Sequence, residues 1–111
     1  MTATEPTRAA PARPCQPRFE LGAIVTTPGA LEACPFDRMT RCLTRHLTAD
    51  WGCVDPEDAA ANDEALLFGM RIISSYPIDP AKPCEGWGKN TLWIITEADR
   101  SATTFLLPEE Y

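Results

Sequence analysis

The chain has 111 residues, of which 44% are hydrophobic and 23% charged, and this composition fits one small domain with a modest core. Residues 1–18 contain three arginines and one glutamate, a balance of +2, so residues 19–111 must carry −8 to give the net charge of −6. This negative charge repels phosphate backbones, which argues against direct nucleic-acid binding and favours either basic partners or simple solubility.

The first 18 residues have the composition of a disordered tail. They contain four prolines, several alanines and threonines, and no large apolar residue after Met1, so they cannot bury enough surface to offset the entropy of ordering. They also lack the apolar core of a signal peptide, and no apolar run in the sequence is long enough to span a membrane. We therefore expect a cytoplasmic protein with a single domain over residues 19–111.

A strand and a helix are predicted to open the domain. Residues 19–27 place apolar side chains alternately on one face, and Pro28 and Gly29 end the pattern. Pro35 suits the first turn of a helix whose apolar stripe is Phe36, Met39, Leu43 and either His46 or Leu47. The opposite face of this helix then carries three arginines, Arg38, Arg41 and Arg45.

The second predicted helix spans residues 56–68. Asp55, followed by a proline and two acids, is typical of a helix start, and Gly69 is a suitable end. The helix displays the most acidic patch in the chain, formed by Glu57, Asp58, Asp63 and Glu64. We interpret this patch as a surface that could bind a basic partner.

Three strands are predicted to complete the chain. Residues 70–76 form the first, and an irregular loop rich in proline and glycine follows over residues 77–88. Residues 91–96 and 102–107 are rich in β-branched and aromatic side chains and flank a short polar connector, which is a hairpin signal. Trp93 lies in the middle of the first of these two runs and is predicted to be buried.

The order strand, helix, helix, strand, strand, strand predicts an α+β fold. Sequential strands pair most often, so we expect an antiparallel sheet of about four strands with both helices packed on one face. The hairpin has two largely apolar faces, and the helices are the segments long enough to cover it.

The sequence predicts no catalytic residue, no metal and no cofactor. The five cysteines are odd in number and irregularly spaced, and Cys42 and His46 alone have the spacing of a helical ligand pair, so we expect free thiols. A Cys–His nucleophile lacks a surrounding signature, and no phosphate-binding glycine loop is present. The polar connector at residues 97–101 is interpreted as a turn in which Asp99 caps backbone amides.

Several short motifs resemble those of a known group of proteins. They are Arg45-His46, Asp50-Trp51-Gly52, Asn62, Ala65-Leu66, Arg71-Ile72, Ser75-Tyr76 and the C-terminal WIITEADRSATTFLLPEEY. The match covers residues 19–111 and resembles a family of small uncharacterised proteins carried on plasmids and integrated elements of Gram-negative bacteria. Members are labelled plasmid-related or as a subunit of a type I restriction system, so the resemblance implies a mobile genetic element as the setting. Residues 77–88 are longer here than the link that the family tends to have.

Two hypotheses follow for function. The first is a non-enzymatic interaction protein of a mobile element, for instance an inhibitor of a host CRISPR or restriction nuclease whose basic, nucleic-acid-binding surface it occupies. Its interaction residues would be Glu57, Asp58, Asp63, Glu64, Asp50, Trp51, Asp99 and Arg100.

The alternative is a small nuclease-like enzyme, because the strand order is similar to that of RelE-like ribosome-dependent ribonuclease toxins. Its active-site residues would be Arg45, His46, Asp99 and Arg100. Such toxins are generally basic, so the charge of −8 on residues 19–111 favours the first hypothesis.

Overall fold

A computed structural model describes residues 16–111, and residues 1–15, with most of the predicted tail, lie outside the described residues. The amide of Arg18 donates to the carbonyl of Leu47 at 2.9 Å, so the chain contacts the domain one residue before its predicted start. No helix in the described part is both long and apolar enough to cross a membrane.

The elements in chain order are β1 (Ala23–Thr26), α1 (Pro28–Ala33), α2 (Phe36–Leu47), α3 (Pro56–Phe68), β2 (Ile72–Pro77), β3 (Thr91–Thr96), β4 (Ala102–Leu106) and the 3-10 helix η3 (Pro108–Glu110).

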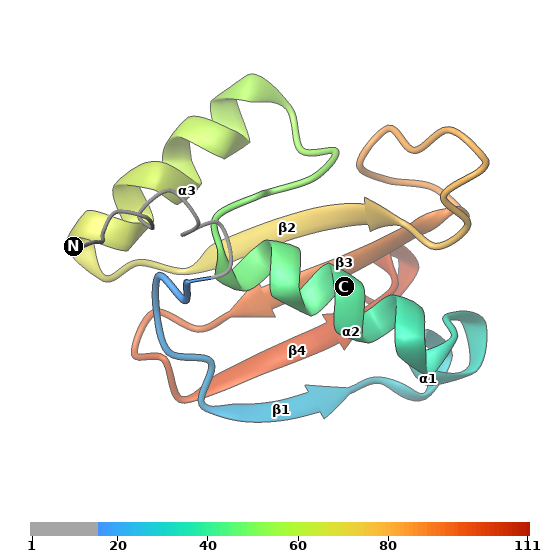
Figure 1. The fold of residues 1–111 in the computed structure, drawn as a ribbon, viewed down its shortest axis with the longest axis horizontal. Helices are drawn as coiled ribbons and strands as arrows, with labels where there is room; N and C mark the ends of the chain where they lie inside the picture. Colours follow the sequence, from blue (N-terminus) through green and yellow to red (C-terminus); the bar gives the residue numbers. More distant parts are fainter. Residues whose placement is uncertain (1–15) are drawn as a thin grey trace, which may run out of the picture.

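The four strands form one sheet in the order β1-β4-β3-β2, which confirms the α+β class (Figure 1). β2, β3 and β4 form the predicted antiparallel meander, but β1 pairs with β4 in parallel. The expectation of a purely antiparallel sheet is therefore wrong for β1. Figure 1 shows the reason: α2 carries the chain back across the sheet, so β2 starts at the end where β1 started. Two reversals later, β4 also runs in the direction of β1.

The helix α1 was not predicted, because Pro28 and Gly29 read as the end of a strand and not as the start of a helix. The side chain of Thr27 accepts from the amide of Ala30 at 3.2 Å, and Pro28 fits the first turn. Glu110 accepts from the Thr27 hydroxyl at 2.6 Å and from the Gly29 amide at 3.1 Å. The C-terminal end of the chain therefore holds the start of α1 in place.

The helix α2 confirms the first predicted helix, with a different buried stripe. Met39, Cys42 and His46 are buried, whereas Phe36 is 80% exposed. Around the helix, His46 lies between Met39 and Cys42, and Phe36 lies about a quarter turn away from the middle of this stripe. α2 packs its stripe on the sheet face that carries Ile72, Ser74, Tyr76, Leu92, Ile94 and Phe105.

The helix α3 begins and ends where its capping residues predict. The Asp55 side chain accepts from the Asp58 amide at 2.9 Å, and Gly69 ends the helix in the left-handed conformation with φ +67°. Asn62 is buried, whereas Leu67 is 79% exposed. α3 packs alongside β2, the outer strand at one side of the sheet (Figure 1).

The outer side of β2 is paired, and we call it the closed edge. The Asn62 side chain donates to the carbonyl of Ile73 at 2.8 Å and accepts from its amide at 3.1 Å. Two residues later, the Ser75 amide donates to the Trp51 carbonyl at 3.1 Å, and its carbonyl accepts from the Cys53 amide at 2.7 Å. The segment at residues 51–53 and one asparagine thus replace a neighbouring strand. At the opposite side of the sheet, β1 has β4 as its single neighbouring strand within residues 16–111, and we call its outer side the open edge.

Trp93 lies on the sheet face opposite α2 and is half-buried, so the prediction that it belongs to the core is wrong. Its ring packs edge-on against Tyr111, with ring centroids 5.5 Å apart. The side chains of Leu92 and Ile94, on either side of it, face α2 and are fully buried. The end of the chain covers this second face less completely than α2 covers the first.

Candidate functional site

A groove of about 410 Å³ lies beside the closed edge, between β2, β3, α3 and the loop after β2. We call it the acidic groove. Its chemically distinctive side chains are the aromatic residues Trp87, Trp93 and Tyr111, the acids Asp55, Asp58 and Glu85, and the single base Arg71.

Two aromatic side chains of the acidic groove are held by neighbours: the Trp93 and Tyr111 rings pack against each other, and Tyr111 also contacts Arg71. The Arg71 guanidinium lies 5.6 Å from the centre of the Tyr111 ring and donates to its hydroxyl at 2.5 Å. Trp87 and Tyr111 are each 66% exposed. Large aromatic surfaces are therefore available to a ligand while their positions are partly fixed.

The loop at residues 77–88 is attached to the sheet at the floor of the groove. The Gly86 carbonyl accepts from the Trp93 indole at 2.8 Å and from the Ser75 hydroxyl at 3.0 Å. Gly86 has φ +94°, and a Cβ atom there would lie 2.9 Å from the Cys53 carbonyl oxygen. These contacts hold Glu85 and Trp87, on either side of Gly86, at the rim of the groove.

The charge of the acidic groove is negative. Three carboxylates, from Asp55, Asp58 and Glu85, face one guanidinium from Arg71, which leaves a balance of −2. A cation next to both a carboxylate and an aromatic face gains from each of them. The arrangement can therefore bind a lysine or arginine side chain that enters between the loop and α3.

The four acids predicted as one patch on α3 point in three directions. Asp58 borders the acidic groove. Asp63 accepts from the Trp51 indole at 3.0 Å. Glu57 and Glu64 are exposed, and because they are seven positions apart, about two helical turns, they lie on one side of the helix. Only Asp58 of the four lines the acidic groove.

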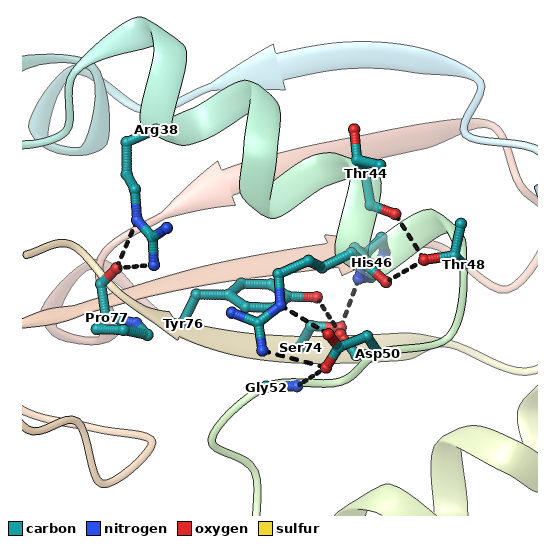
Figure 2. A network of polar contacts seen from close by, with 10 residues as sticks. Arg38, Thr44, His46, Thr48, Asp50, Gly52, Ser74, Tyr76 and Pro77 are labelled. Carbon is teal, nitrogen blue, oxygen red and sulfur yellow. Dashed lines mark hydrogen bonds and ion pairs between the residues drawn. The ribbon is translucent and has the colours of Figure 1, made fainter. Parts of the chain in front are cut away.

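Asp50 and Trp51, predicted as interaction residues, have internal partners, and Figure 2 shows Asp50 with its hydrogen bonds. Both oxygens of Asp50 accept from the Arg45 guanidinium, at 2.7 and 3.2 Å, and Arg45 lies 4.9 Å from the Tyr76 ring centre. The hydrogen bond from Arg45 is the main reason why the pKa of Asp50 is lowered. Trp51 is 7% exposed and packs against His46.

His46 belongs to a buried chain of hydrogen bonds that crosses the sheet. Its Nδ1 meets the Ser74 hydroxyl at 2.6 Å, and its Nε2 meets the Thr96 hydroxyl at 2.8 Å. The Thr103 hydroxyl donates to the Leu21 carbonyl at 2.7 Å, so it must accept from Thr96. Thr96 in turn accepts from Nε2, which therefore carries the proton, and Nδ1 accepts from Ser74. Figure 2 shows the Ser74 end of this chain.

The imidazole of His46 is kept neutral by its surroundings. Burial, and secondarily the positive charge of Arg100, lowers its pKa to about 3. The side chain has no exposed surface, and the Phe19 ring covers it edge-on at 5.2 Å. His46 therefore ties α2 to three strands and does not reach a surface where a substrate could bind.

Asp99 and Arg100 form the turn between β3 and β4. Asp99 accepts from the Ser101 amide at 2.9 Å, which confirms the interpretation of this connector as a capped turn. Arg100 has φ +61° and donates to the carbonyls of Met70 at 2.6 Å and Ala65 at 3.1 Å. Its guanidinium thus holds the end of α3 against the hairpin.

The cysteines of the described residues are free thiols: Cys34 and Cys42 are buried, and Cys53 and Cys84 are half-buried. Burial raises the pKa of Cys34 to about 11, and burial together with a hydrogen bond to Cys84 raises that of Cys53 to about 12. These thiols are protonated at neutral pH. Within residues 16–111, no three His, Cys, Asp or Glu side chains are grouped so that they could share a metal ion.

Comparison of the chain with models of protein families, with curated proteins and with solved structures found no match. The acidic groove is thus the feature from which a function can be inferred. Sequence analysis missed the groove because its members come from five separate segments. One signal was present: Trp87 and Tyr111 stand in polar segments with few apolar neighbours, and isolated aromatic residues of this kind are typical of binding surfaces.

Proposed function

We propose that the protein is a non-enzymatic binding protein that recognises a basic protein surface through its acidic groove. The observation that carries this proposal is that three aromatic rings, three carboxylates and one guanidinium line the same groove. The rings supply apolar contact area and attract cations, at about 0.5–2 kcal/mol per well-placed cation. The carboxylates select for positive charge and speed association.

The partner that fits this chemistry is a protein whose own surface binds nucleic acid, since such surfaces are rich in lysine and arginine. We propose that the chain serves a plasmid or another mobile element in the cytoplasm, where it inhibits a CRISPR or restriction nuclease by covering its nucleic-acid-binding surface. The net charge of −6 supports this proposal, because it keeps the inhibitor away from nucleic acid itself.

A protection assay tests the proposal. Cells with a CRISPR or restriction system are challenged with a targeted plasmid, with and without the full chain, and surviving transformants are counted. We expect protection by the wild type and its loss in the double variant Asp58→Lys with Glu85→Lys, since both carboxylates line the groove.

The matched control is Glu57→Lys with Glu64→Lys, which makes the same change in net charge at exposed positions outside the groove. Glu57 and Asp58 both lie in the first turn of α3, so each double variant loses one acid that favours the helix dipole. Equal loss of protection in the two variants would show that only total charge matters. Absence of protection against every system tested would refute the inhibitor role.

A further inference from the structure

The open edge presents unpaired backbone groups along β1. The amides of Ala23 and Thr27 donate to the carbonyls of Ser101 and Phe105, at 3.0 and 2.9 Å. Because successive residues of a strand point their backbone groups to opposite sides, those of Ile24 and Thr26 point away from β4. In Figure 1 no other element of the described residues lies beyond β1 on this side. Such an edge is a template for one more strand.

An apolar groove of about 260 Å³ lies next to this edge, between β1, α1 and α2. Four of its large apolar side chains are exposed: Ile24 by 51%, Val25 by 46%, Leu31 by 59% and Phe36 by 80%. All nine of the described residues that line it are uncharged. The open edge and the apolar groove therefore form one continuous surface with the chemistry of an interface core.

We propose that a second copy of this chain docks on the open edge, so that two sheets join through antiparallel pairing of β1 with β1. Pairing centred on Val25 places Ile24 of each copy opposite Thr26 of the other. These are the residues whose backbone groups point outward, and each pair can exchange two hydrogen bonds. The result is a symmetric dimer with a continuous sheet of twice four strands.

Charge and area favour a second copy over a basic partner at this place. A basic partner gains nothing from an uncharged surface, whereas two chains of charge −6 can meet here without burying a carboxylate. The four exposed apolar side chains offer roughly 500 Å² per copy, so two copies bury on the order of 1,000 Å², the lower limit for a specific interface. A dimer with a dissociation constant in the micromolar range is expected.

Analytical ultracentrifugation and amide hydrogen exchange of the full chain test this proposal. We expect dimers at about 100 µM and monomers on dilution, with tighter association as salt screens the repulsion between the two acidic copies. Ile24→Lys and Phe36→Ser should each weaken the dimer by about tenfold or more, because each changes an exposed side chain of the interface. Leu67→Lys is the matched control, since Leu67 is equally exposed on α3 and should leave the dimer unchanged.

Hydrogen exchange assigns the contact to the edge itself. The amides of Ile24 and Thr26 should become protected with rising concentration in the wild type and remain unprotected in Ile24→Lys. A chain that stays monomeric at about 1 mM would overturn the proposal. So would a dimer that resists both interface variants, or protection of the two amides that is independent of concentration, which would indicate that residues 1–15 cover the edge.

Discussion

The two outer strands of the sheet, β2 and β1, differ in what lies beside them. Along β2, the Asn62 side chain and the backbone of residues 51–53 bond to the outward groups of Ile73 and Ser75. Along β1, no other strand of residues 16–111 lies beside the outward groups of Ile24 and Thr26. A strand from another chain can pair with an edge whose backbone groups are free. Such pairing is blocked at β2 and possible at β1.

The grooves beside the two edges differ in the charge of their lining residues. The acidic groove at the closed edge combines aromatic rings with a balance of −2, whereas the apolar groove at the open edge is lined by uncharged residues. Salt should therefore weaken binding of a basic partner at the first and strengthen self-association at the second. The comparison teaches that one small sheet can offer two surfaces that attract different partners.

The largest expected effect is the change in the free energy of unfolding with pH that His46 causes. This residue links α2 to Ser74 on β2. Its pKa is lowered to about 3 in the folded chain, from about 6.5 in an unfolded one. As the pH falls through 6.5, the unfolded chain takes up a proton that the folded chain does not. The free energy of unfolding should therefore fall by about 1.4 kcal/mol per pH unit from this residue, or about 4 kcal/mol by pH 3.

Urea unfolding at several pH values between 7 and 4, on the wild type and on His46→Gln, measures this contribution. The variant should be less stable at pH 7 but should lose less stability on acidification. The lowered pKa values of Asp50, Asp99 and Glu110 also weaken the fold in acid, but to the same extent in both proteins. Parallel curves for the two proteins would contradict a neutral, buried His46.

The next largest effect is expected at the closed edge. Asn62→Ala removes both side-chain partners of the Ile73 backbone and should lower the free energy of unfolding by about 2–3 kcal/mol, because two half-buried peptide groups lose their hydrogen bonds. Glu64→Ala, an exposed change on the same helix, should cost less than about 0.5 kcal/mol. A loss below about 1 kcal/mol in Asn62→Ala would mean that water can replace the asparagine.

A smaller effect is expected at the wall of the acidic groove. Tyr111→Ala removes the ring that packs on Trp93 and lies under Arg71, and should cost about 1 kcal/mol of unfolding free energy because Tyr111 is mostly exposed. Tyr111→Phe keeps the ring and loses only the hydroxyl contact with Arg71. It should retain most of the stability. Equal losses in thermal melts of both variants would mean that the ring contributes little.

The smallest effect is expected at the open edge. Ile24→Lys should change the unfolding free energy of the monomer by less than about 0.5 kcal/mol, since half of the side chain is already exposed. Unfolding at concentrations well below dimer formation measures this value. A loss of several kcal/mol would mean that the outer strand β1 depends on the Ile24 side chain, and that the two edges are not as different as described.

Local signals in the sequence predicted much of the fold. Asp55 and Gly69 predict both ends of α3, and runs of β-branched and aromatic residues around a polar connector predict β3 and β4. The failures have non-local causes. α1 is held by Glu110 from the far end of the chain, and the parallel pairing of β1 follows from the direction in which α2 crosses the sheet. Neither the contact of Glu110 with α1 nor the parallel pairing of β1 can be predicted from the residues of a single element.

The sequence predicted that the candidate site is acidic, but it did not predict where on the fold the site lies. Sequence reasoning identified an acidic surface on α3, yet of its four acids only Asp58 borders the groove. Glu85 and Trp87 are delivered by a loop that is attached through the Gly86 carbonyl, and Tyr111 by the end of the chain. Long-range placement of this kind depends on tertiary contacts, which periodicity and capping signals do not describe.

The central claim is that the acidic groove binds basic side chains, and the three tryptophans allow one NMR titration to test it. Trp87 and Trp93 line the groove, whereas the Trp51 indole is bound to Asp63 elsewhere. On addition of a short arginine-rich peptide up to about 1 mM, the indole signals of Trp87 and Trp93 should shift while that of Trp51 remains in place. The shifts should disappear in Asp58→Lys with Glu85→Lys and persist in Glu57→Lys with Glu64→Lys. Unchanged Trp87 and Trp93 signals, or equal shifts in both double variants, would contradict the claim.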